Sequence, residues 1–190
     1  MSGLRAHQVA EFHDTRHRSA PDSELWRAID DNHRHNCLLW DEEDLARRRN
    51  VPDSEIAKNK RAIDGYNQKR NDAIERIDEQ LLAALARVNP LPGSKLNSET
   101  PAAMIDRLSI LALKVHHMRL QTVRADVDRA HVEACGAKLA RLVEQRLELG
   151  ACLDRVLAEA ERGETHFKVY RQFKMYNDPT LNPAIYGEKR

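Results

Sequence analysis

Side chains recur at alternating spacings of four and three residues between positions 56 and 88. The positions in this series are Ile56, Lys60, Ile63, Asn67, Arg70, Ile74, Ile77, Leu81, Ala84 and Val88. Such spacing places all of these side chains along one face of a helix. At 1.5 Å per residue, a helix over residues 54–88 would be roughly 50 Å long. The series therefore predicts a long amphipathic helix whose apolar face packs against other helices.

Three polar residues, Lys60, Asn67 and Arg70, interrupt this face within about three turns. A charge on a packing face is costly unless it is paired or hydrogen-bonded. An ammonium, an amide and a guanidinium so close together could hold a phosphate or a carboxylate. Alternatively, they form a buried ion-pair network that fixes the register of the helices. A small rotation of the helix would bring Tyr66 onto the face and move Asn67 to its edge.

Capping residues, prolines and loop residues divide the chain into four long helical segments. The breaks are Ser19, Pro21, Asp22 and Ser23 before the first helix, Val51-Pro52-Asp53-Ser54 before the second, Asn89-Pro90-Leu91-Pro92-Gly93-Ser94 and Thr100-Pro101 before the third, residues 126–128 before the fourth, and Gly163 near its end. The first helix would extend to about Asn50. Long helices joined by short loops favour an all-α fold. We predict a bundle of four long helices over residues 21–163, preceded by a polar N-terminal segment over residues 1–20.

Residues 164–190 have a different composition, rich in aromatic and basic side chains. The aromatic residues of this segment are Phe167, Tyr170, Phe173, Tyr176 and Tyr186, with Lys168, Arg171 and Lys174 among the first four. So many aromatic side chains argue against a disordered tail. We predict that this C-terminal segment packs on the bundle. Its basic and aromatic residues could also stack bases and neutralise phosphates, an alternative that remains open.

The overall charge limits the possible binding partners, and the cysteine content indicates the cellular compartment. Lysine plus arginine total 31 and aspartate plus glutamate total 30, so no global field attracts nucleic acid or an anionic membrane. We therefore do not expect a nucleic-acid partner. Three cysteines without a Cys-x-x-Cys pair are typical of reduced thiols in the cytoplasm. No apolar run is long enough for a signal peptide or a membrane span, and we predict a cytoplasmic protein.

The first helix carries a polar flank at three- to four-residue spacing. Its members are Asn36, Trp40, Glu43, Asp44 and Arg47. Trp40 could provide a flat surface for a base or a sugar, or it could be a core residue. Glu43 and Asp44 could bind Mg²⁺ through oxygen ligands, or they could form salt bridges to Lys60 or Arg70.

Two further carboxylates and one arginine complete the candidate set. Asp64 lies one turn from both Lys60 and Asn67, and the third helix carries Asp106 and Arg107. The candidate Mg²⁺ ligands are thus Glu43, Asp44, Asp64 and Asp106. Arg107 could extend an anion site or simply be solvated. The sequence contains neither Gly-x-Ser-x-Gly nor a glycine-rich phosphate loop, so it offers little support for nucleophilic catalysis.

Four sequence blocks resemble a bacterial family catalogued as domain of unknown function 4254. The blocks are Asn36-x-x-x-Trp40-x-x-Glu43-Asp44-x-x-Arg47, Lys60-x-x-Ile63-Asp64-x-x-Asn67-Gln68-x-Arg70-Asn71-Asp72, Glu99-Thr100-Pro101-x-x-Met104-Ile105-Asp106-Arg107-Leu108-Ser109-Ile110 and Lys174-Met175-Tyr176-Asn177-Asp178-Pro179-x-x-Asn182-Pro183. The resemblance assigns no catalytic residue. It implies an association with glycosyltransferases of surface-polysaccharide assembly, because members often lie near them. It also suggests that the polar flanks converge on one pocket.

We therefore expect a polar pocket between helices that binds a phosphorylated or nucleotide-sugar-like anion, in a protein accessory to cell-envelope glycan synthesis. The predicted ligand-binding residues are Trp40, Lys60, Asn67, Arg70, Arg107, Lys174 and Tyr176. In this hypothesis Lys60, Arg70 and Arg107 contact the anion, Asn67 orients it and Trp40 stacks on it. Lys174 and Tyr176 would close the pocket.

Two alternatives stay open at the level of the sequence. The first is a Mg²⁺-dependent phosphohydrolase that uses the four carboxylates, although the paired acidic signatures of all-helical nucleotide pyrophosphatases are not cleanly present. The second is an interaction protein, possible as a homo-oligomer, whose polar helix face sets register or assembly.

Overall fold

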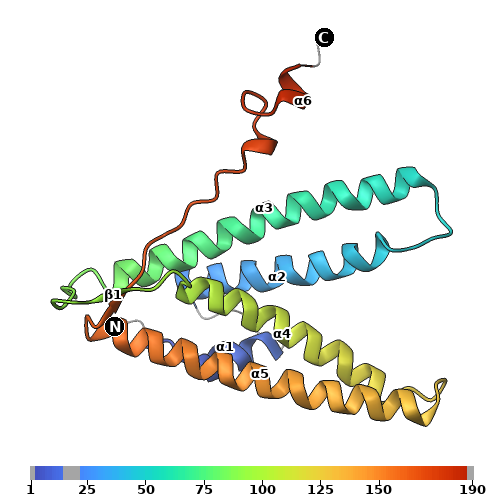
Figure 1. The fold of residues 1–190 in the computed structure, drawn as a ribbon, viewed down its shortest axis with the longest axis horizontal. Helices are drawn as coiled ribbons and strands as arrows, with labels where there is room; N and C mark the ends of the chain where they lie inside the picture. The colour runs from blue at the N-terminus through green and yellow to red at the C-terminus, as the bar shows by residue number, and fades with distance from the viewer. Residues whose placement is uncertain (1–2, 15–21, 188–190) are drawn as a thin grey trace.

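A computed structural model describes residues 3–14 and 22–187. Its four long helices are α2 (Glu24–Leu45), α3 (Asp53–Ala84), α4 (Pro101–Thr122) and α5 (Arg129–Glu161), as Figure 1 shows. A shorter helix, α1 (Ala6–Asp14), precedes them. The predicted all-α bundle of four long helices is confirmed. Over the described residues, no helix is both long and apolar enough to cross a membrane.

Three of the four long helices begin at a side-chain cap, whereas α3 begins after Pro52 without the predicted one. Ser23 Oγ accepts a hydrogen bond from the amide of Trp26 at 3.3 Å, and Thr100 Oγ1 accepts one from the amide of Ala103 at 3.2 Å. Asp128 caps α5 in the same way. Such caps satisfy amides that have no partner within the helix. Ser19 and Pro21, which also belong to the predicted start signal, lie outside the described residues.

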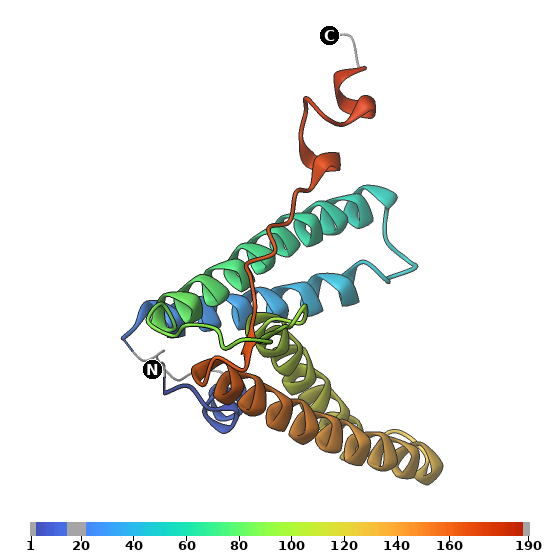
Figure 2. The same ribbon diagram turned by 60° about the vertical axis from the view of Figure 1, so that its left-hand side comes forward.

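The four long helices form two antiparallel hairpins, α2–α3 and α4–α5. The hairpins meet at one end through contacts of α4 with α2 and α3, and they diverge toward the α2–α3 and α4–α5 loops (Figures 1 and 2). The bundle is therefore closed at one end and open at the other.

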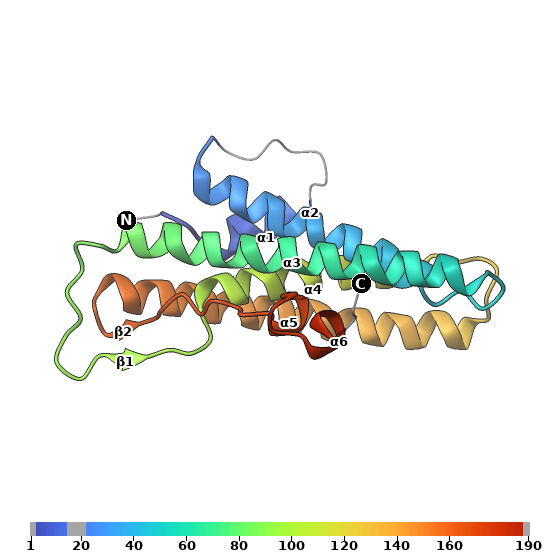
Figure 3. The same ribbon diagram turned by 90° about the horizontal axis from the view of Figure 1, so that it is seen from above.

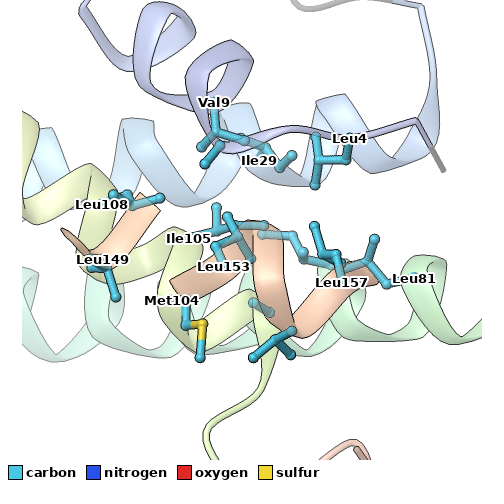
Figure 4. Close-up of a cluster of buried hydrophobic side chains, with 14 of the residues drawn as sticks. Leu4, Val9, Ile29, Leu81, Met104, Ile105, Leu108, Leu149, Leu153 and Leu157 are labelled. Carbon is cyan, nitrogen blue, oxygen red and sulfur yellow. The ribbon is translucent and has the colours of Figure 1, made fainter. Parts of the chain in front are cut away.

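The closed end contains the main apolar cluster. Figure 4 shows Val9 and Ile29 facing Ile105 and Leu153, and each of these four side chains is fully buried. Helix α1 contributes to this cluster by packing on α4 and α5. The sequence prediction separated residues 1–20 from the bundle, whereas the structure packs residues 4–14 into its core.

Helix α1 is fixed by polar contacts with α5. Arg146 Nη2 donates to the carbonyl of Ala10 at 2.6 Å, and its Nη1 lies 2.9 Å from Asp14 Oδ1. The amide of Ala6 donates to Asp154 at 2.8 Å. A Cβ at Gly150 would lie 3.4 Å from the Ala6 side chain, so a small residue lets α1 approach closely. Arg146 and Gly150 both interrupt the apolar stripe of α5, and docking of α1 explains them.

Beyond α5, the chain turns at Gly163, whose φ of +75° strongly favours glycine. Strand β2 (Thr165–His166) then pairs in parallel with β1 (Lys95–Leu96), beside the closed end of the bundle (Figure 3). The following residues run along α3, where Arg171 pairs with Glu75 at 2.7 Å and also with Glu79. Phe167 is buried. Residues 165–172 therefore pack on the bundle, as predicted for the C-terminal segment.

Residues 173–187, which we call the C-terminal arm, differ from that prediction. This arm contains a 3₁₀ turn, η1 (Met175–Asn177), and the short helix α6 (Pro183–Tyr186). It leaves the bundle beside α3 and projects away from it (Figures 1 and 2). Phe173, at its start, is 86% exposed.

Candidate functional site

A buried polar network joins α2 to α4 next to the apolar cluster. Asp106 Oδ1 accepts hydrogen bonds from Asn32 Nδ2 at 2.8 Å and from Asn36 Nδ2 at 2.9 Å. The exposed fractions of these residues are 8% for Asp106, 0% for Asn32 and 3% for Asn36. In a dry environment such charge-assisted bonds are strong, and each donor would be costly to leave unpaired. The two asparagines thus hold the carboxylate in one position.

Ser109 and two histidines extend this network toward α1. Asn36 Nδ2 also donates to Ser109 Oγ at 3.0 Å, and His33 Nδ1 lies 2.8 Å from the same oxygen. A hydroxyl can accept from Asn36 and donate to His33 at once. The His33 ring stacks on His13 at 4.6 Å between ring centroids. Burial lowers the pKa of His13 well below its ordinary value, with smaller contributions from His33 and Arg146, so this ring is neutral near pH 7.

Arg70 reaches the network from α3. Its Nε lies 3.7 Å from Asp106 Oδ1, and the side chain is 27% exposed. This Nε is buried and has no hydrogen-bond partner among the residues that the structure describes. A buried donor without a partner forfeits roughly 1–3 kcal/mol. Arg70 is therefore held beside a carboxylate through its buried Nε, while the exposed part of its side chain is available to a ligand.

A pocket of about 270 Å³ opens beside Arg70, between α2, α3 and α4. It is lined by Asn36, Leu39, Trp40, Glu43, Asp44, Arg47, Arg70, Ile110 and Leu113. Asn36 and Arg70 belong both to the pocket wall and to the buried network. A ligand in this pocket would therefore contact side chains that the network holds in place.

The rim of the pocket carries both signs of charge. Glu43 accepts from Arg47 at 2.6 Å and lies 3.6 Å from Lys60 Nζ. The hydrogen bond from Arg47, aided by Lys60, holds the pKa of Glu43 below its ordinary value. The Trp40 ring stacks on His117 at 4.4 Å with an angle of 10° between the rings, which fixes the orientation of the indole. The pocket thus combines a guanidinium pair, two carboxylates and one aromatic wall.

Comparison with protein families assigns the chain to a group. Residues 26–169 match the model of the family described as "Protein of unknown function (DUF4254)". The chain belongs to this family. Neither the curated proteins nor the solved structures gave a match to the chain.

The DUF4254 match contains the whole pocket and all of the buried network except His13, since these residues lie between Asn32 and Leu113. It ends at residue 169, before the C-terminal arm. The block Lys174–Pro183, on which part of the resemblance in sequence rests, therefore lies outside the matched region.

The structure brings four of the predicted site residues to one pocket. Trp40, Glu43, Asp44 and Arg70 line it, and Asp106 lies directly behind Arg70. Lys60 is connected to the rim only through Glu43, and its side chain is 57% exposed.

The other predicted residues lie elsewhere. Asn67 is half-buried on α3 but does not line the pocket, and Asp64 is exposed. Arg107 faces away from the network, pairs with Glu99 and lines a separate groove on the α4–α5 hairpin. Lys174 and Tyr176 lie on the C-terminal arm, which projects away from the bundle in Figure 1, and neither lines the pocket.

The candidate Mg²⁺ ligands are not gathered in one place. Glu43 and Asp44 line the pocket, Asp106 is engaged by the two asparagines, and Asp64 is on the exposed side of α3. Within residues 3–14 and 22–187, no three side chains of His, Cys, Asp or Glu are grouped so that they could hold a metal ion.

The buried face of α3 contains Ile63, Ile77 and Leu81 of the predicted series, but its polar members differ from the predicted ones. Asn59, Asn71 and Asp78 are buried, whereas Lys60 is not. Asn71 donates to Gln172 at 2.9 Å and so anchors the C-terminal segment. Asp78 accepts the amide of Ala102 at 3.0 Å and so caps the first turn of α4. These two polar residues of the buried face therefore hold neighbouring segments in place.

The sequence patterns did not identify Asn32, His33 or Ser109 as site residues. The spacing of small polar residues on two helices could nevertheless have indicated them. Asn32 and Asn36 lie four residues apart, between the apolar positions Ile29 and Leu39, and Asp106 and Ser109 lie three residues apart on α4. Small polar residues at helical spacing on two faces indicate a polar contact between helices. The sequence does not say, however, that these two faces meet.

Proposed function

We propose that this protein binds a phosphorylated sugar in the pocket between α2, α3 and α4. One observation carries the proposal: the Arg70 side chain lines the pocket and is 27% exposed, while its buried Nε lies 3.7 Å from Asp106 Oδ1. A phosphate oxygen of a ligand in the pocket would pair with the Nη groups of this guanidinium, whose Nε side is held by Asp106. The neighbouring Arg47 supplies a second guanidinium on the rim.

The mixed charge of the pocket favours a sugar phosphate over a simple polyanion. Glu43 and Asp44 would repel additional phosphates, but their oxygens can accept hydrogen bonds from sugar hydroxyls. Trp40 offers an apolar face on which a sugar ring can stack. A volume of about 270 Å³ lies just below the usual range of roughly 300–1,000 Å³ for ligand pockets, so it suits one sugar phosphate better than a whole nucleotide sugar.

We further propose that binding occurs in the bacterial cytoplasm and serves cell-envelope glycan synthesis. The family resemblance supports the link to glycan synthesis, and the cysteine usage supports the cytoplasmic location.

A thermal-shift screen of monosaccharide phosphates tests the proposal, because a ligand that binds only the folded state raises its melting temperature. We expect at least one sugar phosphate to raise the melting temperature, while the corresponding free sugar does not. Arg70→Ala should abolish the shift. Arg107→Ala is the matched control, since Arg107 also pairs with a carboxylate of the chain but lies outside the pocket.

Two further measurements keep the test decisive. Circular dichroism establishes that Arg70→Ala is folded, and Trp40→Ala provides a second variant that leaves the buried network intact. No shift with any sugar phosphate, or equal shifts in the wild type and in folded Arg70→Ala, would contradict the proposal. Loss of the shift only in Arg107→Ala would move the site to the α4–α5 groove.

A further inference from the structure

The C-terminal arm carries an unusual amount of exposed apolar surface. Its large exposed side chains are Phe173 at 86%, Met175 at 57%, Tyr176 at 65%, Leu181 at 49%, Ile185 at 42% and Tyr186 at 62%. Monomeric proteins rarely expose large apolar patches without a binding role. The concentration of such side chains in one short projecting segment indicates a binding element.

The arm is held in shape by its own hydrogen bonds. Asp178 Oδ1 accepts from the amide and the hydroxyl of Thr180, at 2.8 and 2.6 Å. Asn182 Nδ2 donates to the carbonyl of Tyr176 at 2.7 Å, and Asn182 also caps α6. At its base, Gln172 is fixed by the side chains of Asn71 and Glu75. A segment that is ordered before binding loses less conformational entropy when it docks.

A groove suitable for such an arm lies between the diverging hairpins. It has a volume of about 640 Å³ and is lined by Trp40, Asp44, Lys114, His117, Met118, Gln121, Lys138, Arg141, Leu142 and Gln145. Trp40, Met118 and Leu142 offer apolar surface, while Lys114, Lys138 and Arg141 supply positive charge. Apolar surface next to cationic side chains suits aromatic side chains, because a cation over an aromatic face is attractive.

The arm and the groove of one chain lie apart. The arm leaves the bundle beside α3 and projects away from it (Figures 1 and 2). The groove is lined by residues from the end of α2 and from the α4–α5 hairpin. The ion pairs of Arg171 with Glu75 and Glu79 fix the direction in which the arm leaves. A second copy of the chain can approach the arm without breaking these contacts.

We propose that the C-terminal arm docks into the Trp40–Arg141 groove of a second copy, so that two copies exchange arms. Each chain supplies one C-terminal arm and one groove between the hairpins, so a reciprocal exchange forms a closed two-fold dimer. Three aromatic side chains per arm, each contributing roughly 150 Å², give two arms about 900 Å² before the groove surface is added. With that surface, the contact exceeds the roughly 1,000 Å² typical of a specific interface.

The exchange would also bring two predicted site residues to the groove. Trp40 and Asp44 line both the groove and the smaller pocket beside Arg70. A docked arm would therefore place Lys174 and Tyr176 of the partner subunit near Trp40. The dimer itself does not depend on any ligand, so its test is separate from the ligand screen.

Sedimentation velocity over a wide range of protein concentration tests the oligomeric state. We expect the full chain to form a dimer, whereas a chain ending at Gln172 and the double variant Phe173→Ser, Tyr176→Ser should be monomers. Leu147→Ser is the matched control, because Leu147 is 71% exposed on α5 but lies outside the groove. A full chain that is monomeric throughout, or a dimer that persists in the truncated chain, would overturn the proposal.

Cross-linking then identifies where the arm docks. A photoreactive phenylalanine analogue at position 176, in an equal mixture of light and ¹⁵N-labelled protein, distinguishes links between copies from links within one chain. We expect light–heavy links to residues 114–121 and 138–145. Links confined to one chain, or between copies at any other surface, would rule out the exchange of arms into this groove.

Discussion

Helices α2 and α4 contact each other through two neighbouring regions of opposite character. Toward the closed end, Ile29 and Ile105 belong to the apolar cluster and are fully buried. About two turns after Ile29 on α2, and directly after Ile105 on α4, Asn36 and Asp106 belong to a buried polar network. Apolar burial stabilises a fold with little directional preference, whereas hydrogen bonds require specific partners at specific distances.

This difference indicates what each region does. The apolar cluster joins α1 and the two hairpins, and it supplies most of the burial that stabilises the bundle. The polar network fixes how α2, α3 and α4 are placed relative to one another beside the pocket. Buried polar groups can confer such structural specificity at some expense of stability, a role that is testable by mutation.

Asp106→Ala should have the largest effect, because it removes the acceptor shared by Asn32 and Asn36 and leaves Arg70 without its counter-charge. We expect a loss of about 3–5 kcal/mol in the free energy of unfolding. Urea denaturation followed by circular dichroism measures this change. A loss below about 1 kcal/mol would show that the network does not stabilise the contact between α2 and α4.

Leu153→Ala tests how much the apolar cluster contributes to stability. Leu153 is fully buried in the cluster, so truncation should cost about 2–5 kcal/mol from lost burial and the resulting cavity. Unlike Asp106→Ala, it should leave a sugar-phosphate thermal shift unchanged in size. If Leu153→Ala abolished ligand binding in a folded protein, the functional separation of the two regions would be lost.

Asp78, which caps α4, gives a test by pH. Burial raises the pKa of Asp78 to about 6 from its ordinary value of 3.8, although hydrogen bonds from Thr100 and Ala102 oppose the shift. The folded state therefore binds the proton more tightly than the unfolded state. The stability contributed by Asp78 is fully present below pH 3.8 and is lost as the pH rises through about 6.

Asp78→Asn isolates this effect, since the amide oxygen can still accept from Ala102. Between about pH 4 and pH 7, the wild type should lose about 2–3 kcal/mol of unfolding free energy relative to Asp78→Asn. Denaturation curves of both proteins at the two pH values give the difference. A constant difference across this range would mean that the Asp78 carboxyl titrates normally.

Lys60→Ala should have the smallest effect. Lys60 is exposed and pairs with Glu43 at 3.6 Å, and exposed ion pairs contribute only about 0–1 kcal/mol. We expect a change of less than about 1 kcal/mol in unfolding free energy. A loss comparable to that of Asp106→Ala would place Lys60 in the network, as its position in the sequence first suggested.

Sequence patterns predicted the helices well because their signals are local. Ser23 and Thr100 cap α2 and α4 at the expected positions, and Pro52 and Pro101 flank helix starts. Helix ends were less well predicted: α2 ends at Leu45 before the expected Asn50, and α3 ends at Ala84 before Val88. Proline marks where a helix cannot continue, but a helix can end several residues earlier.

The candidate site was predicted only in part. The periodicity of α3 predicted that both Arg70 and Lys60 face the neighbouring helices. Arg70 does lie beside Asp106, but Lys60 is exposed and the adjacent Asn59 is buried instead. Adjacent residues on a helix differ by about 100° in direction. A stripe of apolar residues is wide enough to accommodate either choice, and only the packing of α2 against α3 decides between them.

The amino-acid sequence by itself determined the number of long helices, where each begins and which side chains are available for polar contacts, because caps and periodicity act over a few residues. The tertiary structure alone decided which of these side chains meet. Asn36 and Asp106 are 70 residues apart, and they are joined only because α1, α2 and α4 pack at the closed end of the bundle. A contact over such a separation depends on the relative placement of whole helices, which local patterns do not specify.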